Sequence, residues 1–147
     1  MVNELVFKTK VGKKFIIFYA VAIAFMIFVT WFARIHSTDD FSTGLIAVYW
    51  IVFVVFLFAS VVLKTVIADG FVRVKSILPL YKVPIRDITR IEKGHTMWVG
   101  FHKHGTATNG LIISSSSKND LYITPQDEDL FINKILEMNH RVVVEKP

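Results

Sequence analysis

The stretches FIIFYAVAIAFMIFVTWFA (residues 15–33) and GLIAVYWIVFVVFLFASVVL (residues 44–63) decide the fold of this chain. Each has about the length that an α-helix needs to cross a bilayer core, which is roughly 20 apolar residues. Neither stretch contains a charged side chain, and the segment 34–43 between them is short. The pair therefore predicts a transmembrane helical hairpin within an N-terminal region of residues 1–64.

Two other interpretations of these stretches account for less of the sequence. Two helices buried in a soluble bundle would need more cover than the remaining roughly 100 residues supply, because both stretches are apolar on every face. A cleaved signal peptide has an apolar core of only roughly 7 to 15 residues. The bulky sequence WFAR at residues 31–34 also offers no small-x-small cleavage site. The first stretch is therefore expected to stay as a membrane anchor.

The distribution of basic residues predicts how the hairpin is oriented. Lysine and arginine accumulate on the cytoplasmic side of membrane proteins. The segment 34–43 holds a single arginine against Asp39 and Asp40. Basic residues flank both outer ends of the hairpin: Lys8, Lys10, Lys13 and Lys14 before it, and Lys64, Arg73, Lys75 and Lys82 after it. We therefore expect a multi-pass protein of the inner (cytoplasmic) membrane with both termini in the cytoplasm.

The composition limits what the rest of the chain can be. With 147 residues, 53% of them hydrophobic, the chain has room for the hairpin and one small cytosolic domain, residues 65–147. The absence of cysteine excludes disulfides, thiolate metal sites and cysteine nucleophiles. The net charge of +5 comes largely from residues beside the spans, so it predicts no nucleic-acid partner.

Beyond residue 63 the apolar pattern changes to the alternation that is typical of strands. Residues 65–68 and 71–77 are expected to form two strands around Asp69-Gly70, a dipeptide favoured in type I′ turns. Alternation in the second strand points its valines inward and its basic side chains toward water: Val72 and Val74, then Arg73 and Lys75.

Prolines and isoleucines set the pattern that follows. Pro79 and Pro84 bracket another turn and exclude a helix there. Ile85, Ile88 and Ile91 then recur at a spacing of three, which fits a strand with a bulge and a single helical turn equally well. Three more short strands are expected at residues 97–101, 110–114 and 120–124.

The last expected element is a helix over residues 125–138. Thr124 is the expected N-cap, Pro125 the first helical residue and Asp127 the acid of a capping box. Its apolar face follows the helical period: Phe131, Ile135 and Met138, with Ile132 and Leu136 beside them. A helix of this kind after a series of strands predicts a small barrel that the helix covers at one end.

The segments KVPIRDITRIE (residues 82–92) and YITPQD (residues 122–127) carry a family resemblance. With the terminal helix and the N-terminal hairpin, the chain from about residue 65 to 144 resembles bacterial pleckstrin-homology-like (PH-like) domain proteins with a two-helix membrane anchor. The resemblance implies an α+β domain in which a small antiparallel β-barrel is capped by a C-terminal helix. No residue of these motifs is a catalytic group, and the resemblance implies neither a ligand nor a cofactor.

Three histidines are the only cluster with the chemistry of a metal site. His102 and His104 share a face if they lie in a strand, and His95 can approach from a neighbouring strand. Gly100, Gly105 and other turn residues nearby favour a solvated loop instead. We therefore predict no metal site, with His102 and His104 as weak candidate ligands.

The basic residues after the second span form a second candidate site. An anchored domain holds them just below the inner leaflet, where each gains about 1 kcal/mol from anionic lipid. A solvated surface explains the same residues equally well. The residues expected to face lipid or a partner are Lys64, Arg73, Lys75, Lys82 and Arg86, with Arg90 and Lys93 in the same basic set.

No motif in the sequence supports an enzyme, since glycine-rich phosphate loops and the Gly-x-Ser-x-Gly turn are absent. We expect a non-enzymatic, membrane-anchored interaction module that binds membrane lipids or an unidentified protein, and we leave open whether it forms a homo-oligomer. The alternative hypothesis is protection of the cell against a membrane-active peptide toxin. A pore or transporter subunit is disfavoured because the spans carry no ionisable group to line a path.

Overall fold

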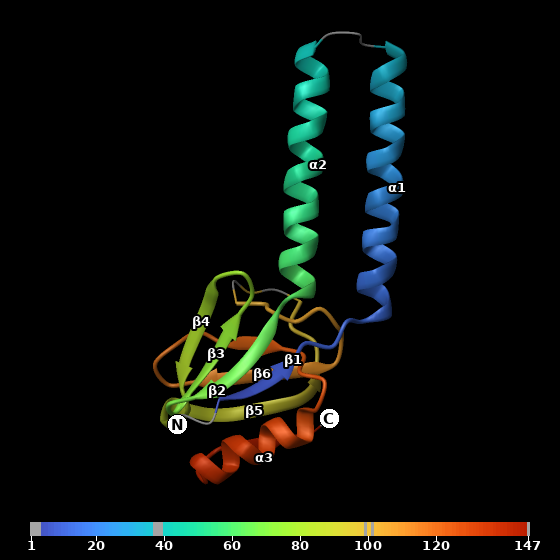
Figure 1. The fold of residues 1–147 in the computed structure, drawn as a ribbon. Helices are drawn as coiled ribbons and strands as arrows, with labels where there is room; N and C mark the ends of the chain where they lie inside the picture. Colours follow the sequence, from blue (N-terminus) through green and yellow to red (C-terminus); the bar gives the residue numbers. More distant parts are fainter. Residues whose placement is uncertain (1–3, 37–39, 99, 101, 147) are drawn as a thin grey trace.

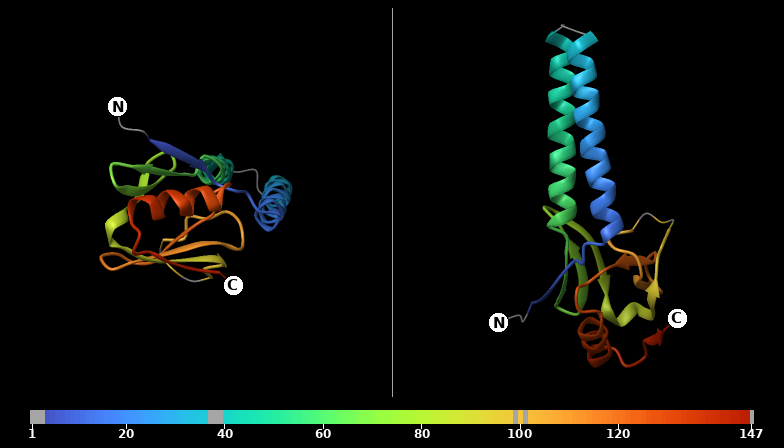
Figure 2. Two further views of the ribbon diagram at one scale, coloured as in Figure 1. Left: turned by 90° about the horizontal axis from the view of Figure 1, so that it is seen from below. Right: turned by 90° about the vertical axis from the view of Figure 1, so that its right-hand side faces the viewer.

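Two long helices rise from a region of two β-sheets in the computed structural model (Figure 1). The structure describes residues 4–36, 40–98, 100 and 102–146. The helices are α1 (Lys13–His36) and α2 (Asp40–Val61), which run side by side in opposite directions (Figures 1 and 2). Both are long and apolar enough to cross a membrane, and 6% and 0% of their apolar windows are buried inside the protein. The expected pair of apolar helices is therefore present.

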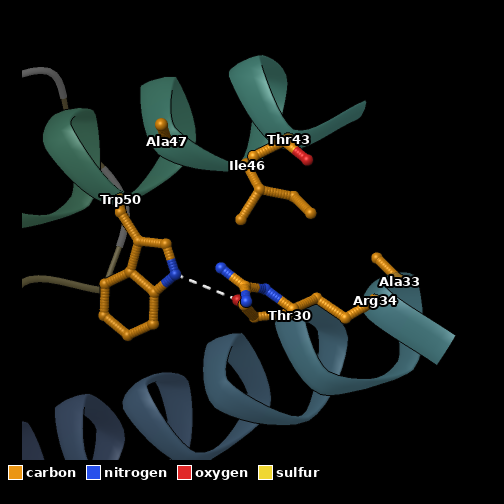
Figure 3. Close-up of a pocket in the computed structure, with 7 residues that line it drawn as sticks. All are labelled: Thr30, Ala33, Arg34, Thr43, Ile46, Ala47 and Trp50. Carbon is orange, nitrogen blue, oxygen red and sulfur yellow. Dashed lines mark hydrogen bonds between the residues drawn. The ribbon is translucent and has the colours of Figure 1, made fainter. Parts of the chain in front are cut away.

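A few polar contacts join the two helices. The Tyr19 and Ser60 hydroxyls lie 3.3 Å apart, and the Trp50 indole nitrogen donates to the Thr30 hydroxyl at 3.0 Å. Arg34 extends toward the same pocket as Thr30 and Trp50, near the end of the helices that is remote from the sheets (Figure 3). Such interhelical hydrogen bonds stabilise a hairpin in lipid, where dispersion and polar pairing replace the hydrophobic effect.

The first sheet contains strands from both sides of the helical hairpin. Its order is β1 (Leu5–Lys8), β2 (Lys64–Ala68), β3 (Phe71–Lys75) and β4 (Pro79–Pro84), and every pair is antiparallel. The turn between β2 and β3 has positive φ at Asp69 (52°) and Gly70 (73°), as the type I′ prediction requires. The helical hairpin therefore occupies the connection between two neighbouring strands of one sheet.

The second sheet has the order β7 (Leu121–Ile123), β6 (Gly110–Ser115), β5 (Ile88–His95) and β8 (Val143–Glu145). Only the pair between β5 and β8 is parallel. A single 3₁₀ turn, η1 (Ile85–Asp87), precedes β5, and a register shift follows between Ile88 and Arg90. The isoleucine spacing therefore reflects both of the expected features, a helical turn and an irregular strand.

The expected small β-barrel does not close within the described residues, which form two separate sheets. On one side the chain after β1 bridges the sheets: the Lys10 N–H donates to the Thr124 carbonyl at 2.6 Å, and the Gly12 N–H to the Thr106 carbonyl at 2.9 Å. These are isolated bridges and not a continuous ladder. Within the described chain no ladder joins β4, the other edge of the first sheet, to the second sheet.

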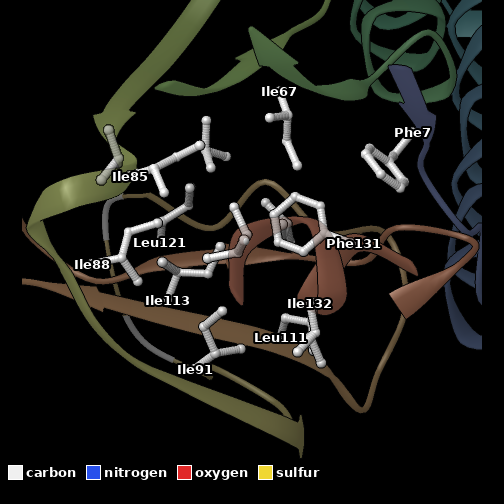
Figure 4. Close-up of a cluster of buried hydrophobic side chains, with 14 of the residues drawn as sticks. Phe7, Ile67, Ile85, Ile88, Ile91, Leu111, Ile113, Leu121, Phe131 and Ile132 are labelled. Carbon is white, nitrogen blue, oxygen red and sulfur yellow. The ribbon is translucent and has the colours of Figure 1, made fainter. Parts of the chain in front are cut away.

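Helix α3 (Glu128–Met138) lies across the opening between the two sheets (Figure 2). Its Phe131, Ile132 and Ile135 are buried in the core shared by both sheets (Figure 4). The Phe131 ring meets the Phe7 ring of β1 edge to face, with centroids 5.3 Å apart. Met138 is 52% exposed, so the expected apolar face is shorter than the sequence pattern indicates.

The start of α3 differs from the expectation. Asp127 is the N-cap, and its carboxylate accepts the Leu130 N–H at 2.9 Å. Thr124 is not the cap, because its hydroxyl accepts the Thr106 N–H at 3.2 Å and Pro125 is bridged to Thr9. Pairing with the chain after β1 therefore delays the helix by one turn.

Three other expectations need correction. Residues 79–84 form strand β4 and not a turn, because an edge strand tolerates prolines that cannot donate to a ladder. Of the expected strand 97–101, residues 99 and 101 lie outside the described residues, and residues 97, 98 and 100 are in no strand. Leu63, at the end of the second apolar stretch, lies beyond α2 and is buried in the core of the sheets.

Candidate functional site

The outward side of the first sheet carries a cluster of basic side chains, which we call the basic face: Lys64, Arg73, Lys75 and Lys82. Val72 and Val74 of β3 are buried, as predicted, so the residues between them point outward. In the register Lys64 lies opposite Lys75, and Arg73 lies opposite Lys82. Four of the five residues proposed from the sequence therefore converge on one surface.

The basic face keeps an excess of positive charge. The Arg73 guanidinium is 2.8 Å from the Asp69 carboxylate, and the Lys75 ammonium is 3.9 Å from that of Glu4. The Lys82 ammonium lies 3.7 Å from the centre of the Phe71 ring, a cation–π contact. Among the described residues Lys64 and Lys82 are in no ion pair, so two of the four positive charges have no acidic partner.

A groove of about 430 Å³ crosses the basic face. It is lined by the basic residues Arg73, Lys75 and Lys82 and by residues 79–81 of β4. The Arg73 Nε is buried and has no hydrogen-bond partner within the described chain. A buried donor without a partner is costly, and the three cationic side chains that line the groove make it complementary to an anion.

The other basic residues proposed from the sequence lie elsewhere. Arg86 is in η1, beyond the end of β4 that is remote from the hairpin, and its side chain is 88% exposed. Arg90 and Lys93 belong to β5 in the second sheet. Arg90 pairs with Glu92 at 2.8 Å, and Lys93 pairs with Asp129 at 2.6 Å. The hydrogen bond that the Lys93 ammonium donates to Asp129 raises the pKa of Lys93 and lowers that of the Asp129 carboxyl.

The histidine cluster contains two of its three expected members. The His102 and His104 rings are 6.3 Å apart, and the Tyr81 ring lies 4.1 Å from His102. Burial, and then the nearby His102, lowers the pKa of His104. His95 is at the end of β5. Within the residues that the structure describes, no three His, Cys, Asp or Glu side chains are grouped to share a metal ion.

The loop between β3 and β4 is a candidate contact region that the sequence analysis did not identify. The Ser76 hydroxyl donates a hydrogen bond to the Ala59 carbonyl in the last turn of α2, so the loop is attached to the base of the helical hairpin. Ile77, Leu78 and Leu80 beside it are exposed. The run ILPL was the available signal, but its proline favoured a turn and gave no indication of contact with the helix.

The comparison with protein families matches one model, described as a bacterial PH domain, over residues 64–139. The matched segment begins with β2 and ends at the C-cap of α3. The chain belongs to the bacterial PH domain family. The family resemblance drawn from the sequence is thereby confirmed. Comparisons with curated proteins and with solved structures gave no match. Strands β1 and β8, each at the edge of one of the two sheets, lie outside the matched residues.

Proposed function

We propose that this protein is a non-enzymatic interaction module that holds a bacterial PH domain against the inner leaflet of the cell membrane. The helical hairpin supplies the anchor. The basic face and the loop between β3 and β4 supply a contact surface for anionic lipid. The proposal of a non-enzymatic role rests on the sequence, which has no cysteine and no nucleophile motif.

The observation that carries the proposal is the hydrogen bond between Ser76 and the Ala59 carbonyl. Ala59 lies in the apolar part of α2. The hydrogen bond to it therefore holds the exposed side chains next to Ser76 at the same height as the end of the candidate span. Leu78 is 68% exposed, and exposed apolar side chains beside a span are stabilised when they enter the lipid interface.

Electrostatic attraction adds to this apolar contact. Lys64 and Lys75 are register partners at the end of the sheet where α2 enters it. Each basic residue near an anionic membrane surface gains about 1 kcal/mol, and this gain decays over a Debye length of about 10 Å in 0.1 M salt. The basic face therefore favours a docked PH domain at low salt.

A fluorescent probe at the loop tests the proposal on the full chain. Since the chain has no cysteine, Leu78→Cys gives a single attachment site for the polarity-sensitive dye NBD. In vesicles rich in acidic lipid we expect blue-shifted NBD emission, which moves toward the value in water as salt rises from about 0.05 to 0.5 M. Joint charge reversal by Arg73→Glu, Lys75→Glu and Lys82→Glu should produce the same change at low salt.

Ser117→Cys is the matched control, because Ser117 is exposed and its hydroxyl binds the Asp87 carboxylate in η1, away from the hairpin. The dye at this position should report water in every condition. An NBD signal from Leu78→Cys that matches the control would refute lipid docking and leave a protein as the partner of the basic face. Protection against a membrane-active toxin stays a prediction from the sequence.

A further inference from the structure

A second pocket, of about 710 Å³, lies where the base of α1 meets the residues between β5 and β6. One wall is the start of α1 with the residues just before it, and the other includes the segment 105–109. The Gly12 N–H donates to the Thr106 carbonyl at 2.9 Å. A Cβ at Gly12 would lie 2.9 Å from the Ala107 Cα, so only glycine allows the two walls to approach this closely. We call this the junction pocket.

The junction pocket has a strongly basic lining. Its cationic side chains are Lys10, Lys13, Lys14 and Lys103. Among the described residues none of these four is in an ion pair. The closest approach to one is the charge of Lys10 near Glu128, which partly offsets the rise in the pKa of that carboxyl caused by burial. A pocket with this many uncompensated ammonium groups is complementary to an anion.

The remaining lining of the pocket is aromatic. Phe15 and Phe18 come from the first two turns of α1, which carries no charged side chain from there up to Ala33. Trp98 stands opposite, 74% exposed, with the Lys103 ammonium 5.7 Å from the centre of its ring. Tryptophan beside basic residues at the end of a span is typical of the boundary between headgroups and acyl chains.

We infer that the junction pocket binds one anionic phospholipid, with its phosphate among the lysines and the upper part of an acyl chain against Phe15 and Phe18. This inference rests on the proposed function, because it needs α1 in the membrane. A soluble phosphate would use the lysines alone. The aromatic half of the pocket is continuous with the apolar surface of α1, so the site favours a lipid over a soluble phosphate.

Quenching of Trp98 by brominated lipids tests the inference on the full chain. Trp31→Phe and Trp50→Phe leave Trp98 as the single tryptophan. The vesicles consist of phosphatidylcholine with a minor fraction of dibrominated phosphatidylglycerol, or the same fraction of dibrominated phosphatidylcholine. We expect the anionic quencher to be at least about threefold more effective, because several lysines surround the headgroup site. Equal quenching by the two lipids would overturn the inference.

Lysine variants test which residues cause the preference for the anionic quencher. Lys13→Gln, Lys14→Gln and Lys103→Gln together should make the two quenchers equally effective, and a preference that persists would overturn the inference. The matched control changes three lysines outside the pocket: Lys118→Gln, Lys134→Gln and Lys146→Gln. Its preference should match that of the parent chain. Loss of the preference in the control would mean that overall charge is responsible, which also contradicts a specific site.

Two further measurements distinguish a bound lipid from a bound soluble phosphate and guard against a variant that fails to insert. Added inorganic phosphate should not change the quenching ratio, and displacement by it would assign the pocket to a soluble phosphate. If replacing Trp50, which donates to Thr30, prevents insertion, 5-fluorotryptophan in the unmodified sequence reports the Trp98 environment by ¹⁹F NMR.

An NBD signal from Leu78→Cys that indicates lipid, together with unselective Trp98 quenching, refutes the junction pocket alone. An NBD signal that indicates water refutes the proposed function.

Discussion

His104 combines an ionisable ring with a half-buried position. Its Nε2 is buried and has no hydrogen-bond partner among the described residues, and the Tyr81 and His102 rings lie 6.2 and 6.3 Å away. Burial is the larger cause of its lowered pKa, and the neighbouring His102 is the smaller one. A half-buried imidazole with no acidic partner is more stable as the neutral form than one in water.

The pH dependence of stability follows from this shift. Because the pKa of His104 is lower in the folded state than its ordinary value of 6.5, the unfolded chain binds the proton more readily. The free energy of unfolding should therefore fall as the pH drops below 6.5 toward the folded pKa. Urea unfolding of the full chain in detergent micelles at a series of pH values measures this. His104→Gln should flatten the dependence, and an unchanged slope would assign it to other groups.

Single residues were predictable from the sequence where their surroundings are local. Strand alternation separated Arg73 and Lys75 from the buried valines of β3, because the period of a strand is set by its own backbone. Arg86 was grouped with them on charge alone, and the turn at η1 places it elsewhere. Thr124 suited a helix cap by type, but its hydroxyl binds Thr106. That contact depends on residues distant in the sequence.

Helix α3 is fixed to the domain by one face and by its C-terminal end. Phe131 and Ile135 are fully buried, and the Asn139 side chain donates to the carbonyls of Ile85 and Ile88 at 2.8 and 3.1 Å. Phe131→Ala should cost about 3 to 5 kcal/mol in the free energy of unfolding, because it leaves a cavity between the two sheets. Urea unfolding in micelles measures the loss.

Met138→Ala is the control for this prediction, since Met138 belongs to the same helix and is half exposed. Its effect should stay within about 0.5 kcal/mol. Equal losses from both substitutions would show that general weakening of the helix, and not the packing of Phe131, determines the stability.

The elements that the sequence did not reveal are short and depend on distant partners. Strands β1 and β8 have 4 and 3 residues, too few to show a period. β1 lies in the segment that was interpreted only as a basic flank of the hairpin, and its partner β2 follows both helices. The helical hairpin, the Asp69-Gly70 turn and α3 have signals within their own residues, which is why they were predictable.

The whole molecule is a bacterial PH domain over residues 64–139, with a helical hairpin between its first strand, β2, and the preceding strand β1 of the same sheet. Lys8 of β1 and Lys64 of β2 are register partners, so the two helices leave and re-enter the sheet at neighbouring positions. The bonds from Gly12 to Thr106 and from Ser76 to Ala59 attach the base of each helix to the domain. This double attachment fixes which end of the PH domain faces the base of the hairpin.

The membrane topology is the prediction that belongs to the whole chain. If basic residues keep both termini in the cytoplasm, the segment 34–43 faces outward and the PH domain faces inward. The cysteine-free chain allows single cysteines at Ser42 and at Ser116, which is exposed in the loop after β6. A membrane-impermeant thiol reagent should label Ser42→Cys on intact cells and Ser116→Cys only after the membrane is opened. Labelling of Ser116→Cys alone on intact cells would show that the orientation is the opposite of the predicted one. The basic face and the junction pocket would then meet the outer leaflet.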